Sequence, residues 1–231
     1  MRFPTFDNIV TSGEVCKTMA RTKIKICGVT SVDDAKLACL CGADAIGLNF
    51  YSESKRRVTL ETGSAIEFSL LPFVSKVGVF VNPTHGLVNK ALETISLDFL
   101  QFHGSEPVSF CESFRVPYIK AIPAQSSAQI LKDLANYSSA SAILLDTKVG
   151  ARFGGTGEPF DWEIVPESEL PLIVAGGLNP KNVFEAVSLI RPFAVDVSSG
   201  VEKASIKKDF EMIKEFVRQV GRADEAFLGK K

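Results

Sequence analysis

The chain has 231 residues, of which 45% are hydrophobic and 23% are charged, and its formal net charge at pH 7 is −1. This length suits one large domain, and α/β barrels often fill it as a single domain. The small net charge argues against nucleic acid or an acidic membrane as a partner, and no apolar run is long enough to span a bilayer.

Residues 1–22 differ from the rest of the chain because they have no hydrophobic period. They also lack the cationic start and apolar core of a secretory signal. We interpret them as a poorly ordered extension, with Met19 as an alternative start and residues 23–231 as a single domain. The alternative is that the apolar residues of this segment plug the N-terminal end of the domain; these are Phe3, Phe6, Ile9 and Val10.

From residue 23 onward, short apolar strands alternate with helices. The first strand, residues 24–27, ends at Gly28, and Cys27 faces away from Ile24 and Ile26 because side chains alternate along a strand. Further strands are predicted at residues 44–50, 76–81, 97–103, 118–122, 142–146, 171–175 and 193–197. Helices are predicted at residues 32–41, 60–71, 85–95, 106–114, 126–137, 180–190 and 208–220.

Strands that alternate with helices in one domain of this length predict a parallel (β/α)₈ TIM barrel with its helices outside. An open doubly wound sheet is the alternative. No GxGxxG motif follows the first strand and no Walker lysine loop occurs, which disfavours a nucleotide-binding sheet. The glycine-rich stretch 147–161 has no apolar period and is interpreted as a functional loop such as a lid.

The ends of the predicted strands carry reactive and polar side chains, which a barrel brings together at one rim. Each has a simple structural explanation: Cys27 as a small core residue, an aspartate as a helix cap, a histidine as a pocket wall. Their convergence favours a functional site. The candidates are Cys27, the basic run 55–57, Gln101, His103, Asp146 and Asp196, with the turns at 176–177 and 198–200.

The turns after the seventh and eighth strands are typical of phosphate binding in barrels, because backbone amides and a helix N-terminus can hold a phosphate without lysine. A phosphorylated small-molecule substrate follows. Across the rim stand Cys27 and Asp146. A thiolate can remove a carbon-bound proton and a partly desolvated carboxylic acid can protonate an oxygen, which is the pair that aldose–ketose isomerisation needs.

The five cysteines, which are Cys16, Cys27, Cys39, Cys41 and Cys111, do not have the spacing of a metal site. We therefore predict no metal centre. An odd number of cysteines without a disulfide pattern also favours a reducing compartment, and we expect the protein in the cytoplasm.

Several motifs resemble one known family when they are taken together and in order. They are KICGVT, ADAIGLNFYSESKR, VGVFVN, LQFHG, ILLDTK, FGGTG with FDW, GGLNP and RPFAVDVSSGVE. From residue 23 to about residue 220 the chain resembles phosphoribosylanthranilate isomerase, a (β/α)₈-barrel family of tryptophan biosynthesis. The resemblance implies an Amadori rearrangement, without cofactor, of N-(5-phosphoribosyl)anthranilate to 1-(2-carboxyphenylamino)-1-deoxyribulose 5-phosphate.

The resemblance also implies roles for single residues. Cys27 matches the general base that removes the proton from C2 of the sugar, and Asp146 matches the general acid that protonates the furanose ring oxygen. Arg56 matches an arginine beside the anthranilate carboxylate, where its planar fork fits. Further substrate-binding residues are Gln101, His103 and Asp196. The phosphate-binding residues are Gly154, Gly155, Gly176, Gly177, Ser199 and Gly200, and the loop 150–157 is expected to cover the substrate.

A (β/α)₈ barrel is also compatible with two other functions. The histidine-pathway isomerase that performs this chemistry carries an aspartate at the end of its first strand, and Cys27 argues against that family. A non-catalytic phosphate-binding barrel would be favoured by loss of Cys27 or Asp146, and both are present. Asn49 stands where many family members have a more apolar residue, and the sequence leaves open whether the protein is a monomer or a homodimer.

Overall fold

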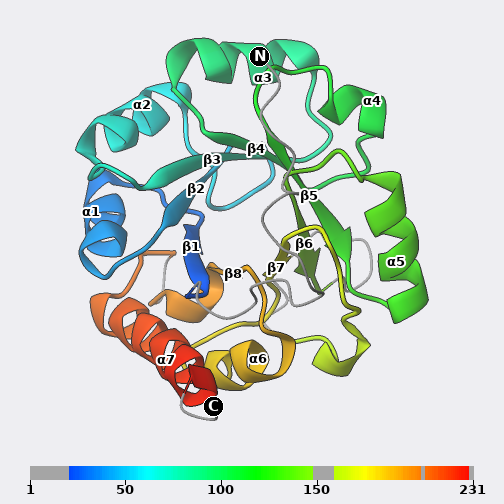
Figure 1. The fold of residues 1–231 in the computed structure, drawn as a ribbon. Helices are drawn as coiled ribbons and strands as arrows, with labels where there is room; N and C mark the ends of the chain where they lie inside the picture. The colour runs from blue at the N-terminus through cyan, green and yellow to red at the C-terminus, as the bar shows by residue number, and fades with distance from the viewer. Residues whose placement is uncertain (1–20, 148–158, 204–205, 229–231) are drawn as a thin grey trace, which may run out of the picture.

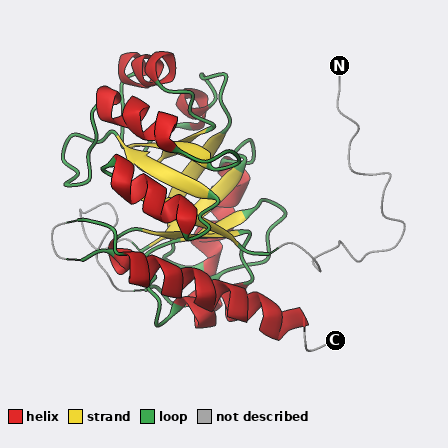
Figure 2. Cartoon of the chain, turned by 90° about the vertical axis from the view of Figure 1, so that its left-hand side faces the viewer, coloured by secondary structure: helices red, strands yellow, loops and turns green. Residues whose placement is uncertain are grey.

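The computed structural model describes residues 21–147, 159–203 and 206–228 (Figure 1). Within these ranges, eight parallel strands form a closed barrel in sequence order, in which β1 pairs with both β2 and β8. Helices surround the strands, as both views show (Figures 1 and 2). The (β/α)₈ barrel predicted from the sequence is therefore confirmed, and the alternative of an open sheet is wrong.

The strands are β1 (Lys23–Cys27), β2 (Ala45–Asn49), β3 (Ser75–Phe80), β4 (Phe99–Phe102), β5 (Tyr118–Pro123), β6 (Ala142–Asp146), β7 (Leu172–Val174) and β8 (Ala194–Val197). The helices are α1 (Val32–Leu40), α2 (Leu60–Ser69), α3 (His85–Thr94), α4 (Val108–Cys111), α5 (Ser127–Asn136), α6 (Val183–Ile190) and α7 (Phe210–Leu228). Two short 3₁₀ helices are η2 (Trp162–Ile164) and η3 (Ser199–Val201).

Serine and threonine hydroxyls fix where several helices begin. Ser31, Thr59, Thr84 and Ser126 each accept a hydrogen bond from the backbone N–H three residues later, which satisfies one of the free donors of the first turn. The positive φ of Gly42, +94°, lets the chain turn sharply after α1. These local signals explain why the predicted helix starts agree closely with the structure.

Two helices differ most from their predicted lengths. The segment 106–114 forms only the short α4, because the Glu106 carboxylate is bonded to Lys120 and to backbone N–H groups of Asn82 and Gly104. At the other end of the chain, α7 begins two residues later than predicted and extends eight residues further. The Asp209 carboxylate accepts from the backbone N–H of Met212 and so holds the first turn of this helix.

Apolar side chains form two layers. The larger layer lies between the strands and the helices and includes Ile24 and Ile26 of β1. The smaller layer fills the barrel itself, and its buried members are Val77, Ile119, Ala121, Ala142, Leu144, Ile173, Ala175 and Ala194. Because side chains alternate along β1, Lys25 and Cys27 face the barrel interior, as the alternation predicts for Cys27.

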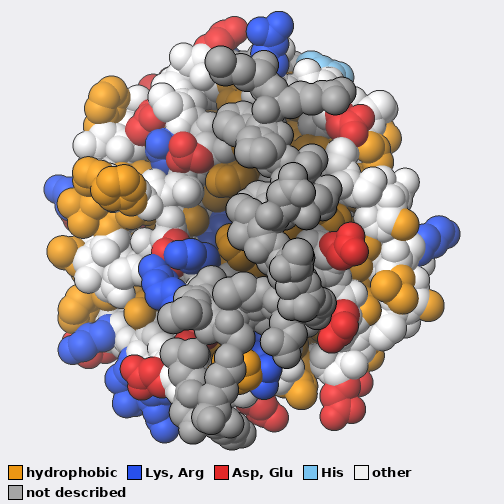
Figure 3. All heavy atoms as spheres, viewed as in Figure 1, with side chains coloured by type: hydrophobic (Ala, Val, Ile, Leu, Met, Phe, Trp, Pro, Cys, Tyr) orange, Lys and Arg blue, Asp and Glu red, His pale blue; other side chains and the backbone are white. Residues whose placement is uncertain are grey.

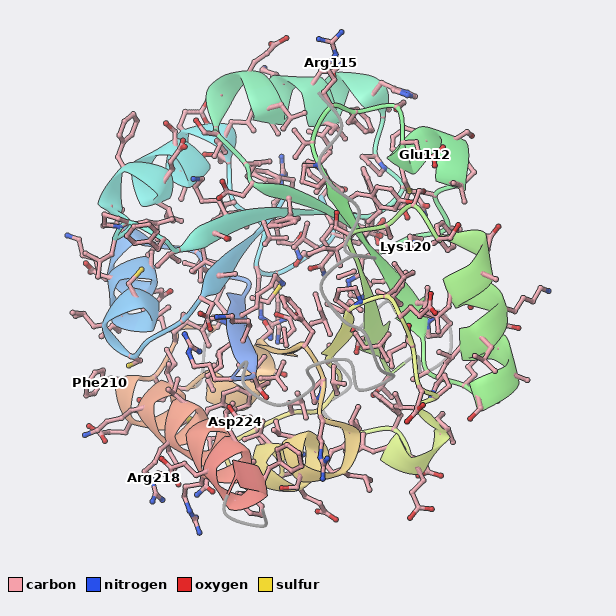
Figure 4. All side chains as sticks on the ribbon, viewed as in Figure 1. Glu112, Arg115, Lys120, Phe210, Arg218 and Asp224 are labelled. Carbon is pink, nitrogen blue, oxygen red and sulfur yellow. The ribbon has the colours of Figure 1, made fainter. Side chains whose placement is uncertain are left out.

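The described chain starts with two residues that the sequence analysis assigns to the extension. Arg21 makes a paired hydrogen bond to the carboxylate of Asp44, and Thr22 is buried. The backbone N–H and the hydroxyl of Thr22 both bond to the Asp224 carboxylate, which lies on the barrel side of α7 (Figure 4). These contacts attach Arg21 and Thr22 to the barrel, and the predicted extension and its alternative as a plug otherwise concern residues 1–20, outside the described residues.

Candidate active site

A cavity of about 600 Å³ opens where the strands end, at the carboxyl-terminal rim of the barrel. It is lined by nine of the residues proposed from the sequence: Cys27, Arg56, Gln101, His103, Asp146, Gly176, Gly177, Asp196 and Ser199. The barrel therefore brings together side chains that are up to 172 positions apart in the chain. Asn49, Tyr51 and Ser198 complete much of the same wall.

Three of the predicted phosphate-binding residues stand apart from this group. Gly154 and Gly155 lie outside the described residues, as does nearly all of the predicted loop. Gly200 is not among the residues that line the cavity, and the space that a side chain there would need is filled by the backbone of Leu178 and Asn179. This packing requires a glycine at position 200, and the predicted contact of Gly200 with the phosphate stays a prediction.

Cys27 is the last residue of β1 and is half-buried in the cavity wall. Burial raises the pKa of its thiol, and the negative charge of Asp196 raises it further, whereas the cations of Lys25 and Lys208 act in the opposite direction. Lys25 donates a hydrogen bond from Nζ to Asp196 Oδ1 over 2.9 Å. The thiol of Cys27 therefore lies in a field of both signs.

Asp146 ends β6 and is held by two donors. The backbone N–H of Thr147 bonds to Asp146 Oδ1 at 2.7 Å, and His103 Nε2 lies 3.1 Å from Asp146 Oδ2. On the other side of the imidazole ring, Gln101 Nε2 lies 3.2 Å from His103 Nδ1. An amide donor makes Nδ1 the acceptor, so this network assigns the ring proton to Nε2, where it is donated to Asp146.

Gln101 is fully buried, yet its amide oxygen has no hydrogen-bond partner among the described residues. A buried acceptor without a partner is unfavourable, since it loses its hydrogen bond to water. This residue also lines the cavity. Gln101 Oε1 is thus an acceptor in the wall of the cavity that is unpaired within the described part of the chain.

The Arg56 guanidinium is bound by a carboxylate that the sequence analysis did not select. Its Nε and Nη2 donate to the two oxygens of Glu202 at 2.7 and 2.8 Å, and Lys208 Nζ donates to the same carboxylate at 2.6 Å. Burial raises the pKa of Glu202, but the hydrogen bonds from Arg56 and Lys208 outweigh it and hold this pKa below its usual value. Glu202 could have been selected from the sequence, because it is the last residue of the RPFAVDVSSGVE motif.

Glycines at the rim keep space beside the reactive groups. Gly176 and Gly177 have φ values of +75° and +66°, in the left-handed region that favours glycine. A side chain at Gly176 would collide with Thr147 and lie 2.8 Å from Asp146 Oδ1. The carbonyl of Gly177 accepts from the side-chain amides of Asn179 and Asn182 at 3.1 and 3.0 Å, which fixes the orientation of this turn.

No group of three or more metal-ligating side chains occurs among the residues that the structure describes. In the same ranges, no helix has the length and apolar character needed to cross a membrane. The fold and the cavity together define a (β/α)₈-barrel enzyme that is equipped for acid–base chemistry. The thiol of Cys27 and the carboxyl group of Asp146 line the same cavity.

Comparison with known proteins identifies the family. The family model for N-(5'phosphoribosyl)anthranilate (PRA) isomerase matches residues 24–219. An N-(5'-phosphoribosyl)anthranilate isomerase of Pseudomonas fluorescens is 46% identical over 209 residues, which cover 90% of this chain and all of the relative. One from Azotobacter vinelandii is 48% identical over 206 residues, or 89% of this chain and all of the relative. The chain belongs to the N-(5'-phosphoribosyl)anthranilate isomerase family, so it is an isomerase of tryptophan biosynthesis.

Solved structures agree with this assignment. The phosphoribosyl anthranilate isomerase of Thermotoga maritima matches with a TM-score of 0.78 at 38% identity, over 87% of this chain and 99% of that one. Another such structure, at 37% identity with a TM-score of 0.75 over the same shares, holds reduced 1-(o-carboxyphenylamino)-1-deoxyribulose 5-phosphate. A third, at 36% identity with a TM-score of 0.74 over the same shares, is of monomers generated from the dimeric enzyme of Thermotoga maritima.

Proposed function

We propose that the cavity converts N-(5'-phosphoribosyl)anthranilate to 1-(2-carboxyphenylamino)-1-deoxyribulose 5-phosphate with Asp146 as general acid and Cys27 as general base. Asp146 protonates the furanose ring oxygen, and the bond from this oxygen to C1 breaks to give a Schiff base. The Cys27 thiolate then removes the proton from C2. The resulting enolamine tautomerises to the ketone, so that no electron leaves or enters the substrate.

The single observation that carries this proposal is the presence of Cys27 and Asp146 in one cavity, at the ends of β1 and β6. Both residues lie in the part of the chain that matches the family model of this isomerase. After Asp146 gives up its proton, its carboxylate accepts hydrogen bonds from His103 and from the backbone of Thr147. Donors already in place for the developing charge stabilise the transition state without reorganisation.

Recognition of the substrate follows from its two acidic groups and its hydroxyls. The backbone amides of Gly177 and Ser199 bind the phosphate, together with Gly176, in the turns after β7 and β8. Arg56 retains N–H donors beyond the two that Glu202 occupies, and these bind the anthranilate carboxylate. Gln101 Oε1 accepts from a sugar hydroxyl, and Asp196 lines the pocket. Gly154 and Gly155 remain predicted phosphate contacts.

The test is an assay of the purified protein with phosphoribosylanthranilate, whose fluorescence disappears on conversion. We expect the fluorescence to fall at a rate proportional to protein concentration, without added metal or cofactor. The product is an isomer of the substrate with the same mass, so it is identified by its reaction with the next enzyme of the pathway. Failure to consume this substrate in folded protein would overturn the proposal.

We propose in addition that the protein is a homodimer. Large apolar side chains gather on the surface beside α2 (Figure 3), and Phe68, Leu71 and Phe73 are 87%, 52% and 102% exposed. Exposed apolar groups of this size favour a protein partner, and a dimeric relative is known. Sedimentation velocity is expected to give a dimer mass, and Phe73→Asp to give a monomer; a native monomer at micromolar concentration would refute the dimer.

The cellular compartment is also a proposal. The described cysteines, which are Cys27, Cys39, Cys41 and Cys111, are all free thiols. Free thiols persist where the surroundings are reducing, which supports the cytoplasm. Localisation of a tagged chain by microscopy tests this.

A further inference from the structure

Lys25 is a buried cation in the barrel interior that the acid–base scheme above does not use. It precedes Cys27 by two residues on β1 and so faces the same side of the strand. Its side chain is 4% exposed, and Nζ donates to Asp196 Oδ1 over 2.9 Å. A lysine is almost never buried this deeply unless it is paired. Burying the charges of Lys25 and Asp196 carries a desolvation penalty in free energy, which suggests that the pair has a role.

The strand beside β1 leaves space for Lys25 and Cys27 to meet. Gly47 of β2 is the direct partner of Cys27 in the sheet. A Cβ atom at Gly47 would lie 2.7 Å from Cys27 Sγ and 3.1 Å from Lys25 Nζ. The sulfur and the ammonium therefore lie no further apart than those two lengths together, within reach of the roughly 4–6 Å over which an opposite charge favours the charged form.

The charged side chains around Cys27 carry one more positive than negative charge. Three cations face the thiol from different elements: Lys25 on β1, Arg56 after β2 and Lys208 before α7. Two carboxylates pair with them, because Asp196 binds Lys25 and Glu202 binds both Arg56 and Lys208. One positive charge is left over, which a thiolate at Cys27 would neutralise.

Beyond this group, the charged residues that line the cavity are Asp146, Glu53 and Lys55. Asp146 is engaged by His103, and Glu53 and Lys55 are exposed at the rim and carry opposite signs. The charges that act on the pKa of Cys27 are those of Asp196, Lys25 and Lys208.

We propose that Lys25 is a positioning residue for the reaction: its ammonium group, held in place by Asp196, stabilises Cys27 as the thiolate that acts as the base. This inference rests on the proposed role of Cys27. Lys25 does not touch the substrate in this arrangement, because it lies below Cys27 in the barrel interior, and it acts only through the sulfur.

The direction of the neighbouring effects supports this assignment. Burial lowers the pKa of Lys25, but Asp196 and Cys27 together outweigh it and raise that pKa above 10.5, so Lys25 keeps its charge throughout the assay range. For the thiol, burial and Asp196 raise the pKa above its ordinary value, and Lys25 opposes this rise. Removing Lys25 therefore raises the pKa of Cys27, and removing the charge of Asp196 lowers it.

The experiment measures how fast iodoacetamide alkylates Cys27 in the folded protein as a function of pH, with the modified peptide quantified by mass spectrometry. Only the thiolate reacts. In Lys25→Met, the midpoint of the pH dependence is expected to move up by at least about one unit, which is roughly a tenfold slower reaction at pH 7.5. In Asp196→Asn, the midpoint moves down. Opposite shifts distinguish a charge effect from general damage to the fold.

The matched control is Lys120→Met, which removes a second buried lysine that is paired with Glu106 outside the barrel interior. It is expected to leave the alkylation of Cys27 unchanged. If Lys25→Met does not fold, Asp196→Asn alone tests the sign. An unchanged midpoint in Lys25→Met or an upward shift in Asp196→Asn would overturn the proposal.

Isomerase kinetics then separate this inference from the proposed function. The acidic limb of kcat/KM in Lys25→Met is expected to move by the same amount as the alkylation midpoint, with activity recovering at high pH. If alkylation shifts while the acidic limb does not, Lys25 still controls the thiol but Cys27 is not the base. That result would refute the proposed mechanism and leave the charge assignment in place.

Discussion

Two buried clusters in this protein contain the same three types of side chain and have different consequences. Lys25, Asp196 and Cys27 meet inside the barrel. Lys120, Glu106 and Cys111 meet outside it, between β5 and α4, where Figure 4 labels Lys120. We call these the inner and outer clusters. In both, the lysine and its carboxylate are nearly inaccessible, with side chains 2–8% exposed.

The difference lies in where the lysine hydrogen bonds go. Lys120 Nζ donates to the carbonyl oxygens of Phe102 and Gly104 and to the Glu106 carboxylate, at 3.1, 2.7 and 3.0 Å. Its three protons are therefore used by the fold. Burial raises the pKa of the Cys111 thiol to about 11, with only partial relief from Lys120, and Cys111 is fully buried away from the cavity.

In the inner cluster, Lys25 donates a hydrogen bond to Asp196, and the cysteine opens onto the cavity. The same chemical groups thus stabilise structure when backbone carbonyls surround the lysine. In our proposal, they tune a thiol when the lysine directs its field at a sulfur that opens onto the cavity. Composition alone does not distinguish the two cases.

The largest expected effect is loss of the inner thiol. Cys27→Ala is expected to lower turnover about 10²-fold or more, because a positioned general base contributes on this scale, while circular dichroism stays unchanged. Cys111→Ala is the control from the outer cluster and is expected to keep its turnover. Fluorescence loss of phosphoribosylanthranilate measures both, and near-normal turnover in folded Cys27→Ala would remove the functional distinction between the clusters.

The partner of Cys27 across the cavity sharpens the same distinction. Asp146→Asn keeps the shape of the side chain but cannot supply the acid proton, so turnover is expected to fall about 10²-fold with a smaller change in KM. The pH profile of kcat should lose its alkaline limb if Asp146 is the acid. A variant whose profile and turnover match those of the native protein would mean that Asp146 only orients His103.

The outer cluster is expected to affect stability rather than chemistry. Lys120→Met leaves the Glu106 carboxylate buried without its cation, and breaking such a pair costs about 3–5 kcal/mol. Urea unfolding monitored by circular dichroism should show this loss, while the remaining folded protein keeps the native pH profile. A shifted acidic limb in Lys120→Met would mean that the two clusters are coupled.

A smaller effect is expected from Arg56, the cation that Glu202 holds at the cavity wall. Arg56→Ala should raise KM about tenfold and change kcat little, because the carboxylate contact is present in the bound ground state and in the transition state alike. The control ligand is a substrate analogue without the anthranilate carboxylate, which should bind both proteins equally. Retained preference for the carboxylated ligand in Arg56→Ala would place that carboxylate elsewhere.

The sequence by itself determined the order of the elements and the identity of the candidate groups. Alternation in Lys23–Cys27 separates Ile24 and Ile26 from Lys25 and Cys27, since adjacent side chains on a strand point to opposite faces. Hydrophobic periodicity placed the helices, and the strand ends supplied the residues of the cavity. These properties depend on neighbours in the chain, so they can be predicted from a short window.

Only the tertiary structure decided which charges pair. Lys25 and Asp196 are separated by 171 positions and Arg56 and Glu202 by 146, and they meet because the barrel closes with β1 beside β8. The bond from His103 to Asp146 likewise crosses the rim between β4 and β6. Such pairs depend on distances between strands, which hydrophobic periodicity does not encode, and so the role of Lys25 emerges only once the barrel is closed.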